Sequence, residues 1–219
     1  MVWKPASSVP LLAVRLAEAL TSAGLPPGVL NLVIGNSVAG DALVSHAAVD
    51  AITFTGSTGV GRRIAAAAAS RGVPVQAEMG GKNAAVVLDD ADFDLAVEQV
   101  MLGAFRSSGQ KCTATSRLVL TEGIADRFLE ALTTKADSLT VGDPSADATQ
   151  MGPVISRSAQ SDIVGGIDTA KAQGASVLAG GGGYSGGPLA HGHFVAPTIV
   201  ELTKSADIWT EELFGPVLA

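Results

Sequence analysis

The sequence has little cysteine, little aromatic content and little positive charge, and each shortage excludes a class of protein. One cysteine among 219 residues cannot form an internal disulfide, so we expect a reducing, cytoplasmic environment. A formal net charge of −7 leaves no basic surface for phosphates, so no nucleic-acid partner is expected. Aromatic residues make up 4% of the chain, so its core must rest on aliphatic side chains.

Apolar runs suited to a membrane are also missing. The uncharged run at residues 19–40 contains a Pro-Pro pair, four glycines and two asparagines, a composition that breaks helices. Arg15 and Glu18 interrupt the apolar stretch near the N-terminus, so we expect no signal peptide and no membrane partner. With 47% apolar and 16% charged residues, the chain is typical of a folded, soluble protein.

Segments with helical and strand patterns alternate along the chain, which predicts an α/β fold with a mainly parallel sheet. Helices are expected at residues 10–23, 39–45, from the glycine-rich turn to about 70, 92–105 with Asp92 as its cap, 124–139 and 158–173. Strands are expected at residues 29–34, 51–55, 73–77, 84–88, 118–120 and 176–178. The glycine-rich residues 180–192 predict a mobile loop, and a second unit is expected to begin near Gly80-Gly81.

A glycine-rich turn follows the strand that ends in Phe54-Thr55. Gly56 and Ser57 precede a helix start, where free backbone N–H groups and the positive end of the helix dipole suit an anion such as pyrophosphate. The spacing differs from the G-x-G-x-x-G dinucleotide fingerprint. Taken alone, the segment therefore fits an ordinary strand-to-helix turn as well as a phosphate site.

Cys112 lies in a polar segment, which is a poor setting for core packing. A lone cysteine is most often a small buried apolar residue. Here the neighbouring Lys111 favours the thiolate, which is the nucleophilic form. His46 is far upstream, so the spacing gives no support to a Cys–His pair.

Glu78 ends an apolar strand, directly before Met79-Gly80-Gly81-Lys82. A carboxylate at the carboxyl end of a strand points toward the crevice in which α/β proteins bind ligands. In a partly dry site the pKa of Glu78 would rise toward that of a general base, whereas in water it would be an ordinary solvated charge. His191 and His193 have no further ligand candidates nearby, so no metal site is expected.

An ordered set of six segments reaches from one end of the chain to the other and resembles the aldehyde dehydrogenase superfamily. The segments, in chain order, are Lys4-Pro5-Ala6, Gly28-Val29-Leu30-Asn31, Phe54-Thr55-Gly56-Ser57, Glu78-Met79-Gly80-Gly81-Lys82, Gly109-Gln110-Lys111-Cys112 and Glu211-Glu212-Leu213-Phe214-Gly215-Pro216. They occur in the family's order and at plausible separations, which makes the resemblance specific.

The resemblance implies a partial Rossmann-like cofactor domain over residues 1–79 and an α/β catalytic domain over residues 80–219, truncated at its C-terminus. In that family a thiolate, here Cys112, attacks the aldehyde carbonyl to give a thiohemiacetal. Hydride leaves for NAD or NADP, and water then hydrolyses the thioester with Glu78 as the base.

The same resemblance implies contacts to the adenosine half of the cofactor. Lys4 would hold the ribose, Gly56 and Ser57 the pyrophosphate, and Val60 would lie beside the adenine. Many NAD-specific members carry a glutamate where this chain has Ser7. Because serine does not repel a 2′-phosphate, NADP should be tolerated.

Further implied contacts concern the nicotinamide half and the substrate. Glu212 would bind the nicotinamide ribose, Phe214 would pack near the ring, and the Met79 backbone would meet the carboxamide. The residues around the cysteine most resemble semialdehyde dehydrogenases, notably those of α-ketoglutaric semialdehyde. Arg106 or Arg117 would then pair with the carboxylate of such a substrate.

The chain departs from the family pattern in length, which is roughly half of a full member. The upstream asparagine that completes the family's oxyanion hole is absent, and losing one such donor typically costs about 10²–10³ in rate. Cut sheet edges are expected to cause self-association.

Three functions remain open at this point. The first is NAD(P)-dependent oxidation of an aldehyde to a carboxylic acid. The second is a cofactor-independent esterase that cleaves activated esters with Cys112. The third is an inactive fragment that serves as a binding module.

Overall fold

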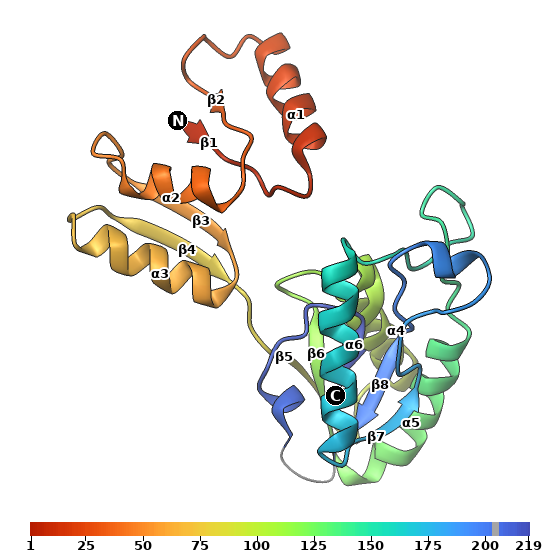
Figure 1. Ribbon diagram of the computed structural model, residues 1–219. Coiled ribbons are helices and arrows are strands. Elements are labelled where there is room, and N and C mark those ends of the chain that lie inside the picture. The colour runs from red at the N-terminus through yellow and green to blue at the C-terminus, as the bar shows by residue number, and fades with distance from the viewer. Residues whose placement is uncertain (203–205) are drawn as a thin grey trace. The chain divides into compact units, whose positions relative to one another are not determined.

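The structure, a computed structural model, describes residues 1–202 and 206–219 (Figure 1). The chain divides into two compact units, Met1–Gly80 and Gly81–Ala219, which we call unit 1 and unit 2. The division falls one residue after the boundary suggested by the sequence. Helices and strands alternate in both units and most strand pairs are parallel, which confirms the predicted α/β fold.

Unit 1 consists of two small parallel strand pairs with accompanying helices. Its elements, in chain order, are β1 (Val2–Trp3), α1 (Pro10–Ser22), β2 (Asn31–Leu32), α2 (Ser37–Ser45), β3 (Ile52–Gly56), α3 (Thr58–Ala69) and β4 (Val75–Met79). β1 pairs with β2, and β3 pairs with β4. The sequence predicts the three helices but misses β1, because two residues are too few to show a strand period.

The contact between α3 and β4 is the best-packed part of unit 1. Ile64 and Ala68 are buried on α3, and a Cβ on Gly61 would collide with the side chain of Met79. β4 ends at Met79, two residues later than predicted, so Glu78 is the second-last residue of the strand. Successive residues of a strand face opposite sides, which leaves the side chain of Glu78 exposed.

Unit 2 holds a larger α/β assembly. Its elements, in chain order, are β5 (Asn83–Val87), α4 (Phe93–Phe105), η1 (Arg106–Gly109), β6 (Thr115–Leu120), α5 (Glu122–Asp137), α6 (Arg157–Ala172), β7 (Ser176–Ala179), η2 (Pro188–His191), β8 (Thr198–Glu201), η3 (Asp207–Trp209) and β9 (Val217–Leu218). β5 pairs with β6, and β8 lies between antiparallel β7 and parallel β9. Two backbone hydrogen bonds join the small sheets: the N–H of Ala219, next to β9, donates to the carbonyl of Ser116, and the N–H of Leu118 in β6 donates to the carbonyl of Ala219.

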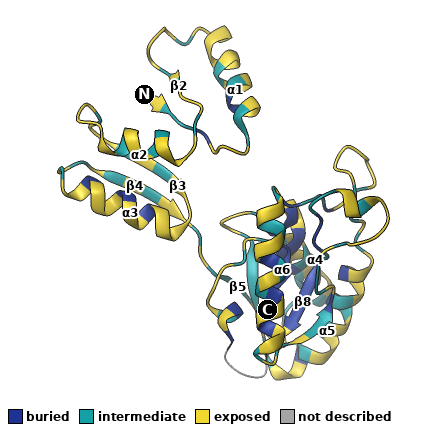
Figure 2. Ribbon diagram, viewed as in Figure 1, coloured by how far each residue is buried: buried dark blue, intermediate teal, exposed yellow. Residues whose placement is uncertain are grey.

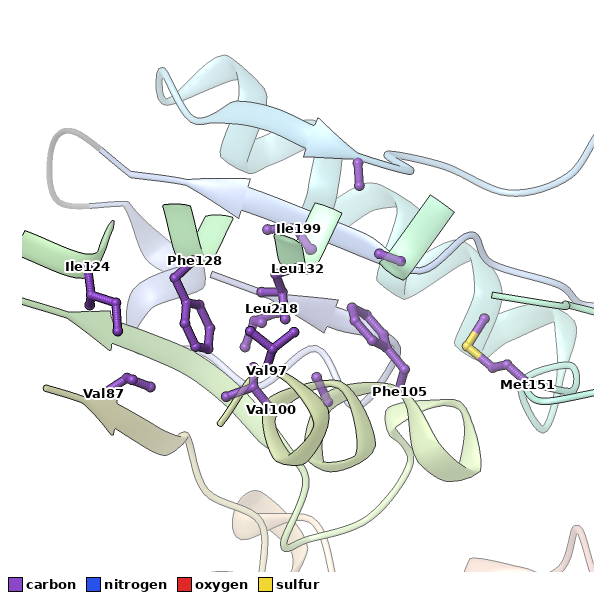
Figure 3. Packing of buried hydrophobic residues seen from close by; sticks show 13 residues of the cluster. Val87, Val97, Val100, Phe105, Ile124, Phe128, Leu132, Met151, Ile199 and Leu218 are labelled. Atoms are coloured by element: carbon purple, nitrogen blue, oxygen red, sulfur yellow. The ribbon is translucent and has the colours of Figure 1, made fainter. Parts of the chain in front are cut away.

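The core of unit 2 lies on both faces of this sheet. Ile199 and Leu218 belong to one buried cluster, whereas their neighbours Val200 and Val217 belong to another. Because successive strand residues point to opposite faces, the two clusters lie on opposite sides. Side chains of α4 and α5, among them Phe128, pack in the first cluster (Figure 3), and α6 covers the second.

Local sequence signals explain several boundaries in unit 2. The predicted cap Asp92 accepts a hydrogen bond from the N–H of Leu95, which fixes the start of α4. The sequence misses β8 and β9, and the segment predicted as a glycine-rich loop contains the short η2. Among the described residues, no helix is both long enough and apolar enough to cross a membrane.

Candidate functional site

Cys112 is exposed on a loop between α4 and β6, residues 106–114, which we call the cysteine loop. Its first part is a run of left-handed residues: Ser107, Ser108 and Gly109 have φ angles of 55°, 55° and 67°. Two successive serines in this region are uncommon and indicate a conformation imposed by the surroundings. A Cβ on Gly109 would collide with the backbone of Gly215, so only glycine fits there.

Polar contacts of Ser108 and Gln110 fix the first half of the cysteine loop. The buried Ser108 hydroxyl donates to the carbonyl of Gly152 at 2.9 Å. The Gln110 carboxamide makes two hydrogen bonds: its oxygen accepts from the N–H of Ile155 at 2.9 Å, and its nitrogen donates to the carbonyl of Phe214 at 3.3 Å. Gln110 thus ties the loop to two distant segments of unit 2.

Asn83 fixes the second half of the cysteine loop. Its side-chain nitrogen donates to the carbonyl of Cys112 at 2.7 Å and to that of Ala114 at 3.0 Å. Sequence reasoning missed this residue. The signal that leads to it is strand register, since Asn83 pairs with Thr115 where β5 and β6 run side by side.

A small pocket adjoins the cysteine loop inside unit 2. Its lining includes Lys82, Lys111, Glu212 and Phe214, so it brings together two predicted cofactor residues, Glu212 and Phe214, with the neighbour of the cysteine. Phe214 is 43% exposed and has a φ of 47°, a second imposed left-handed position.

Charges in this pocket perturb one another. Burial, and next the positive charge of Arg117, lower the pKa of Lys82 to about 8, against the opposing effect of Glu212. Partial burial raises the pKa of Glu212, and a backbone N–H of Gly81 and the charge of Lys82 act in the opposite direction. A lysine and a glutamate that shift each other in one pocket are typical of a functional site.

Arg117 is already engaged by the protein. One guanidinium nitrogen donates to the carbonyl of Lys82 at 2.6 Å, and the guanidinium carbon lies 5.3 Å from the ring centroid of Trp209. These contacts favour a structural role for Arg117 over the substrate contact suggested by the sequence. Arg106, at the end of α4, is exposed.

In unit 1 the predicted cofactor residues gather at one end of a strand pair. Gly56 at the end of β3 pairs with Met79 at the end of β4. Ser57 is the N-cap of α3, but its hydroxyl makes no capping hydrogen bond, and Val60 is exposed in the first turn. Glu78 accepts a hydrogen bond of 3.3 Å from the side chain of Gln76.

The remaining predicted cofactor residues lie at the start of unit 1. The Lys4 ammonium donates to the carbonyls of Pro5 and Gly35, at 2.7 and 3.4 Å. Ser7 is exposed between β1 and α1. Across residues 1–202 and 206–219 there is no cluster of three or more His, Cys, Asp or Glu side chains that could hold a metal ion.

The sequence matches the Aldehyde dehydrogenase family over residues 1–219. It is 44% identical to the alpha-ketoglutaric semialdehyde dehydrogenase of Bacillus subtilis (strain 168), over 100% of this chain and 45% of that protein. It is 41% identical to the betaine aldehyde dehydrogenase of Rhizobium etli (strain CIAT 652), with the same coverages. The chain thus spans just under half the length of these curated relatives. Both are named as dehydrogenases, so they give no support to the esterase hypothesis.

Solved structures agree with the sequence comparison. PnpE from Pseudomonas sp. WBC-3 superposes with a TM-score of 0.96 and 42% identity, over 99% of this chain and 45% of that one. A betaine aldehyde dehydrogenase from Staphylococcus aureus, solved in complex with NAD+, gives 0.95 and 37%, over 99% and 44% of the two chains. The family match along the whole sequence and the shared fold lead to one conclusion: this chain belongs to the aldehyde dehydrogenase family.

Proposed function

We propose that this chain carries the reacting cysteine of an NAD(P)-dependent aldehyde dehydrogenase, which oxidises an aldehyde to a carboxylic acid. The observation that carries the proposal is the exposed Cys112 thiol, held on a hydrogen-bonded loop beside the pocket of Glu212 and Phe214. Structural cysteines are usually buried, whereas a nucleophilic thiol must be reachable.

The chemistry uses Cys112 twice. Its thiolate attacks the carbonyl carbon of the aldehyde, the carbonyl electron pair moves to oxygen, and a thiohemiacetal forms. Loss of hydride from that carbon gives a thioester; bound NAD(P)+ supplies the hydride acceptor. Water then adds to the thioester, Glu78 takes the water proton, and the Cys112 thiolate leaves as the acid forms.

The residues of unit 1 fit the adenosine half of a dinucleotide. The first turn of α3 presents backbone N–H groups without helical partners, and the uncapped Ser57 hydroxyl adds a donor for a diphosphate. Lys4 would hold the ribose, and exposed Val60 offers an apolar surface to the adenine. Ser7 brings no negative charge that would repel a 2′-phosphate, so both NAD+ and NADP+ would be accepted.

In unit 2, Glu212 and Phe214 fit the nicotinamide riboside. The Glu212 carboxylate would accept hydrogen bonds from the ribose hydroxyls, and the exposed Phe214 ring would pack near the nicotinamide. The backbone of Met79, in unit 1, would meet the carboxamide. On this assignment the dinucleotide-binding part is residues 1–79 and the catalytic part is residues 80–219.

The proposed substrate is a semialdehyde that carries a carboxylate. The relative named for α-ketoglutaric semialdehyde supports this choice, and the cysteine loop resembles that branch. Because Arg117 is engaged with Lys82 and Trp209, exposed Arg106 is the better partner for the carboxylate. Turnover of a semialdehyde and of a trimethylammonium aldehyde is measured with the wild type and with Arg106→Ala. A loss of semialdehyde turnover alone in Arg106→Ala would favour the anionic substrate, and better turnover of the trimethylammonium aldehyde by the wild type would favour a cationic one.

Self-association and a reducing, cytoplasmic location complete the proposal. Leu11, Leu12 and Val38 of unit 1 are 78%, 70% and 72% exposed, and a second chain would cover such apolar side chains. A reducing compartment keeps Cys112 as a thiol. Light scattering should give a mass above the 21.9 kDa of one chain.

One experiment tests the proposed reaction directly. Aldehyde-dependent formation of NAD(P)H is compared with cofactor-free hydrolysis of a p-nitrophenyl ester, in the wild type and in Cys112→Ser. We expect Cys112→Ser to lower NAD(P)H formation by at least about 10³-fold, because it removes the nucleophile. Ester hydrolysis without any NAD(P)H formation would instead favour the esterase, and activity that survives in Cys112→Ser would place the nucleophile elsewhere.

A further inference from the structure

We propose that Asn83 is a positioning residue for the Cys112 nucleophile, through the two hydrogen bonds that its carboxamide donates to the cysteine loop. The inference deepens the proposed function, because it concerns the same cysteine. It assigns a role to a residue of β5 that lies 29 positions before Cys112 in the sequence.

The Asn83 side chain makes two contacts with the cysteine loop. One side-chain nitrogen of Asn83 carries two N–H bonds, and both are used: one meets the Cys112 carbonyl at 2.7 Å and the other meets the Ala114 carbonyl at 3.0 Å. The Cys112 carbonyl belongs to the peptide between Cys112 and Thr113. Hydrogen bonds from one Asn83 nitrogen to this carbonyl and to the Ala114 carbonyl therefore fix the orientation of that peptide. The direction of the Cys112 side chain relative to β6 then depends on that orientation.

Few other contacts restrain the part of the cysteine loop around Cys112. Lys111, Cys112 and Thr113 are all exposed, so packing does little to restrain them. The N–H of Ala114 closes a turn on the carbonyl of Lys111 at 2.9 Å, but that bond lies within the loop and cannot anchor it. Asn83 supplies an anchor from outside, at the start of a paired strand.

Two carboxamides, those of Gln110 and Asn83, hold the two halves of the cysteine loop. Gln110 ties the incoming half of the loop to Ile155 and Phe214, and Asn83 ties the outgoing half to β5. The thiol of Cys112 lies between the two anchors. A displacement of about 1 Å in a reacting group costs up to about 10²-fold in rate, so a fixed loop has a direct catalytic value.

The test uses the fact that Cys112 is the only cysteine, so a thiol-specific nitroxide label reports on this loop alone. We expect the spectrum of labelled Asn83→Ala to show a larger mobile component than that of the labelled Asn83 protein. Asn83→Ser keeps one donor and should lie between the two. Asn83→Asp keeps the shape but places a carboxylate against two carbonyls, so its mobile component should be at least as large as in Asn83→Ala.

The matched control is Gln160→Ala. Gln160 lies on α6 in the same unit, and its carboxamide donates to the carbonyl of Phe194 at 2.8 Å. Its loss removes the same kind of contact away from Cys112, so the label spectrum should not change. An unchanged spectrum in Asn83→Ala, or an equal change in Gln160→Ala, would overturn the proposal; if Asn83→Ala does not fold, Asn83→Ser carries the same test.

Kinetics separate this inference from the proposed function. In unlabelled protein, Asn83→Ala should lower kcat for the aldehyde by up to about 10²-fold and leave the KM for NAD(P)+ within about twofold, because no cofactor contact is removed. The label spectrum needs no turnover, so it tests Asn83 even where NAD(P)H formation fails. A full kcat in Asn83→Ala would refute the positioning role while the dehydrogenase assignment stood.

Discussion

Unit 2 buries apolar side chains on two faces of a sheet, whereas unit 1 buries few (Figure 2). Phe105 and Phe128 of unit 2 are at most 1% exposed. In unit 1, all of which is described, the buried apolar residues are Pro5, Ala13, Ile64 and Ala68. A residue in unit 2 is therefore surrounded by packed side chains, whereas a residue in unit 1 has fewer packed neighbours.

The two units also differ in the chemistry proposed for them. The cysteine loop needs fixed anchors. Asn83 provides one from β5, whose Val87 is in the core of unit 2, and Gln110 ties the loop to Ile155 and Phe214. The proposed phosphate site of unit 1 uses backbone N–H groups at a helix start, which one helix on a strand pair can offer with little core. The comparison predicts that unit 2 is the more stable unit and that the cysteine loop keeps its structure when unit 1 is loosened.

The largest expected effect concerns the two cores. Phe128→Ala should lower the free energy of unfolding of unit 2 by about 3–5 kcal/mol, because it removes a fully buried ring that also meets Phe93 edge-on at 5.8 Å. At protein concentrations where the chain is monomeric, Leu12→Ala on α1 should change the unfolding free energy of unit 1 by less than about 0.5 kcal/mol. Each unit has one tryptophan, Trp3 or Trp209, whose fluorescence in urea follows that unit once the other is changed to Phe. A large loss in Leu12→Ala under those conditions would show that Leu12 is packed within unit 1 and would break the comparison.

The next effect tests whether unit 1 contributes a reacting group. Glu78→Gln should leave acylation of Cys112 intact and slow release of the acid by about 10²-fold, because the amide cannot take a proton from water. Rapid-mixing experiments should then show a burst of NAD(P)H, equal to the amount of enzyme, before a slow steady state. Equal slowing of both phases would assign Glu78 a structural role and confine the chemistry to unit 2.

A smaller effect is expected at the cofactor. Ser7→Glu should weaken NADP+ by about tenfold or more relative to NAD+, since a carboxylate repels a 2′-phosphate. Titration calorimetry with both dinucleotides measures the ratio, and Ser8→Glu, one residue along and also exposed, is the matched control. Equal weakening of NAD+ and NADP+ by Ser7→Glu would place this residue outside the ribose site.

The sequence predicts the described helices to within a few residues, because they are long enough to show a helical period and carry caps such as Asp92. It predicts β5 and β6 as well, although it places the start of β6 three residues late. It misses β8 and β9. These strands are four and two residues long and are defined by their pairing with each other and with β7, which no local pattern reports.

The site shows the same limit. Cys112 stands out in the sequence through its polar neighbours, but Asn83 does not, since its role depends on the β5–β6 register that brings it to a loop 29 residues away. The engagement of Arg117 by Trp209 likewise joins residues that only the fold brings together. Local patterns therefore identify the reacting group, and the tertiary structure identifies what holds it.

The last expected effect is a pH dependence confined to unit 2. Burial and Arg117 lower the pKa of Lys82 to about 8, from 10.5 in the unfolded chain, so between these values the unfolded state binds more protons at this site. The free energy of unfolding of unit 2 should therefore rise with pH between about 8 and 10.5 by a contribution from Lys82. Below about pH 8 both states hold the proton, and the burial of the charge weakens the fold. Lys82→Met removes this contribution, so the difference in stability between the variant and the wild type should favour the variant at pH 7 and shrink as the pH approaches 10.5. Urea titrations followed by Trp209 fluorescence, in a Trp3→Phe background, measure that difference across the range. Lys135→Met, at an exposed position near the end of α5, is the matched control and should show no such trend. A difference that does not vary with pH would mean that the Lys82 amine is fully solvated, and the pocket beside the cysteine loop would then lack the desolvation that its charges require.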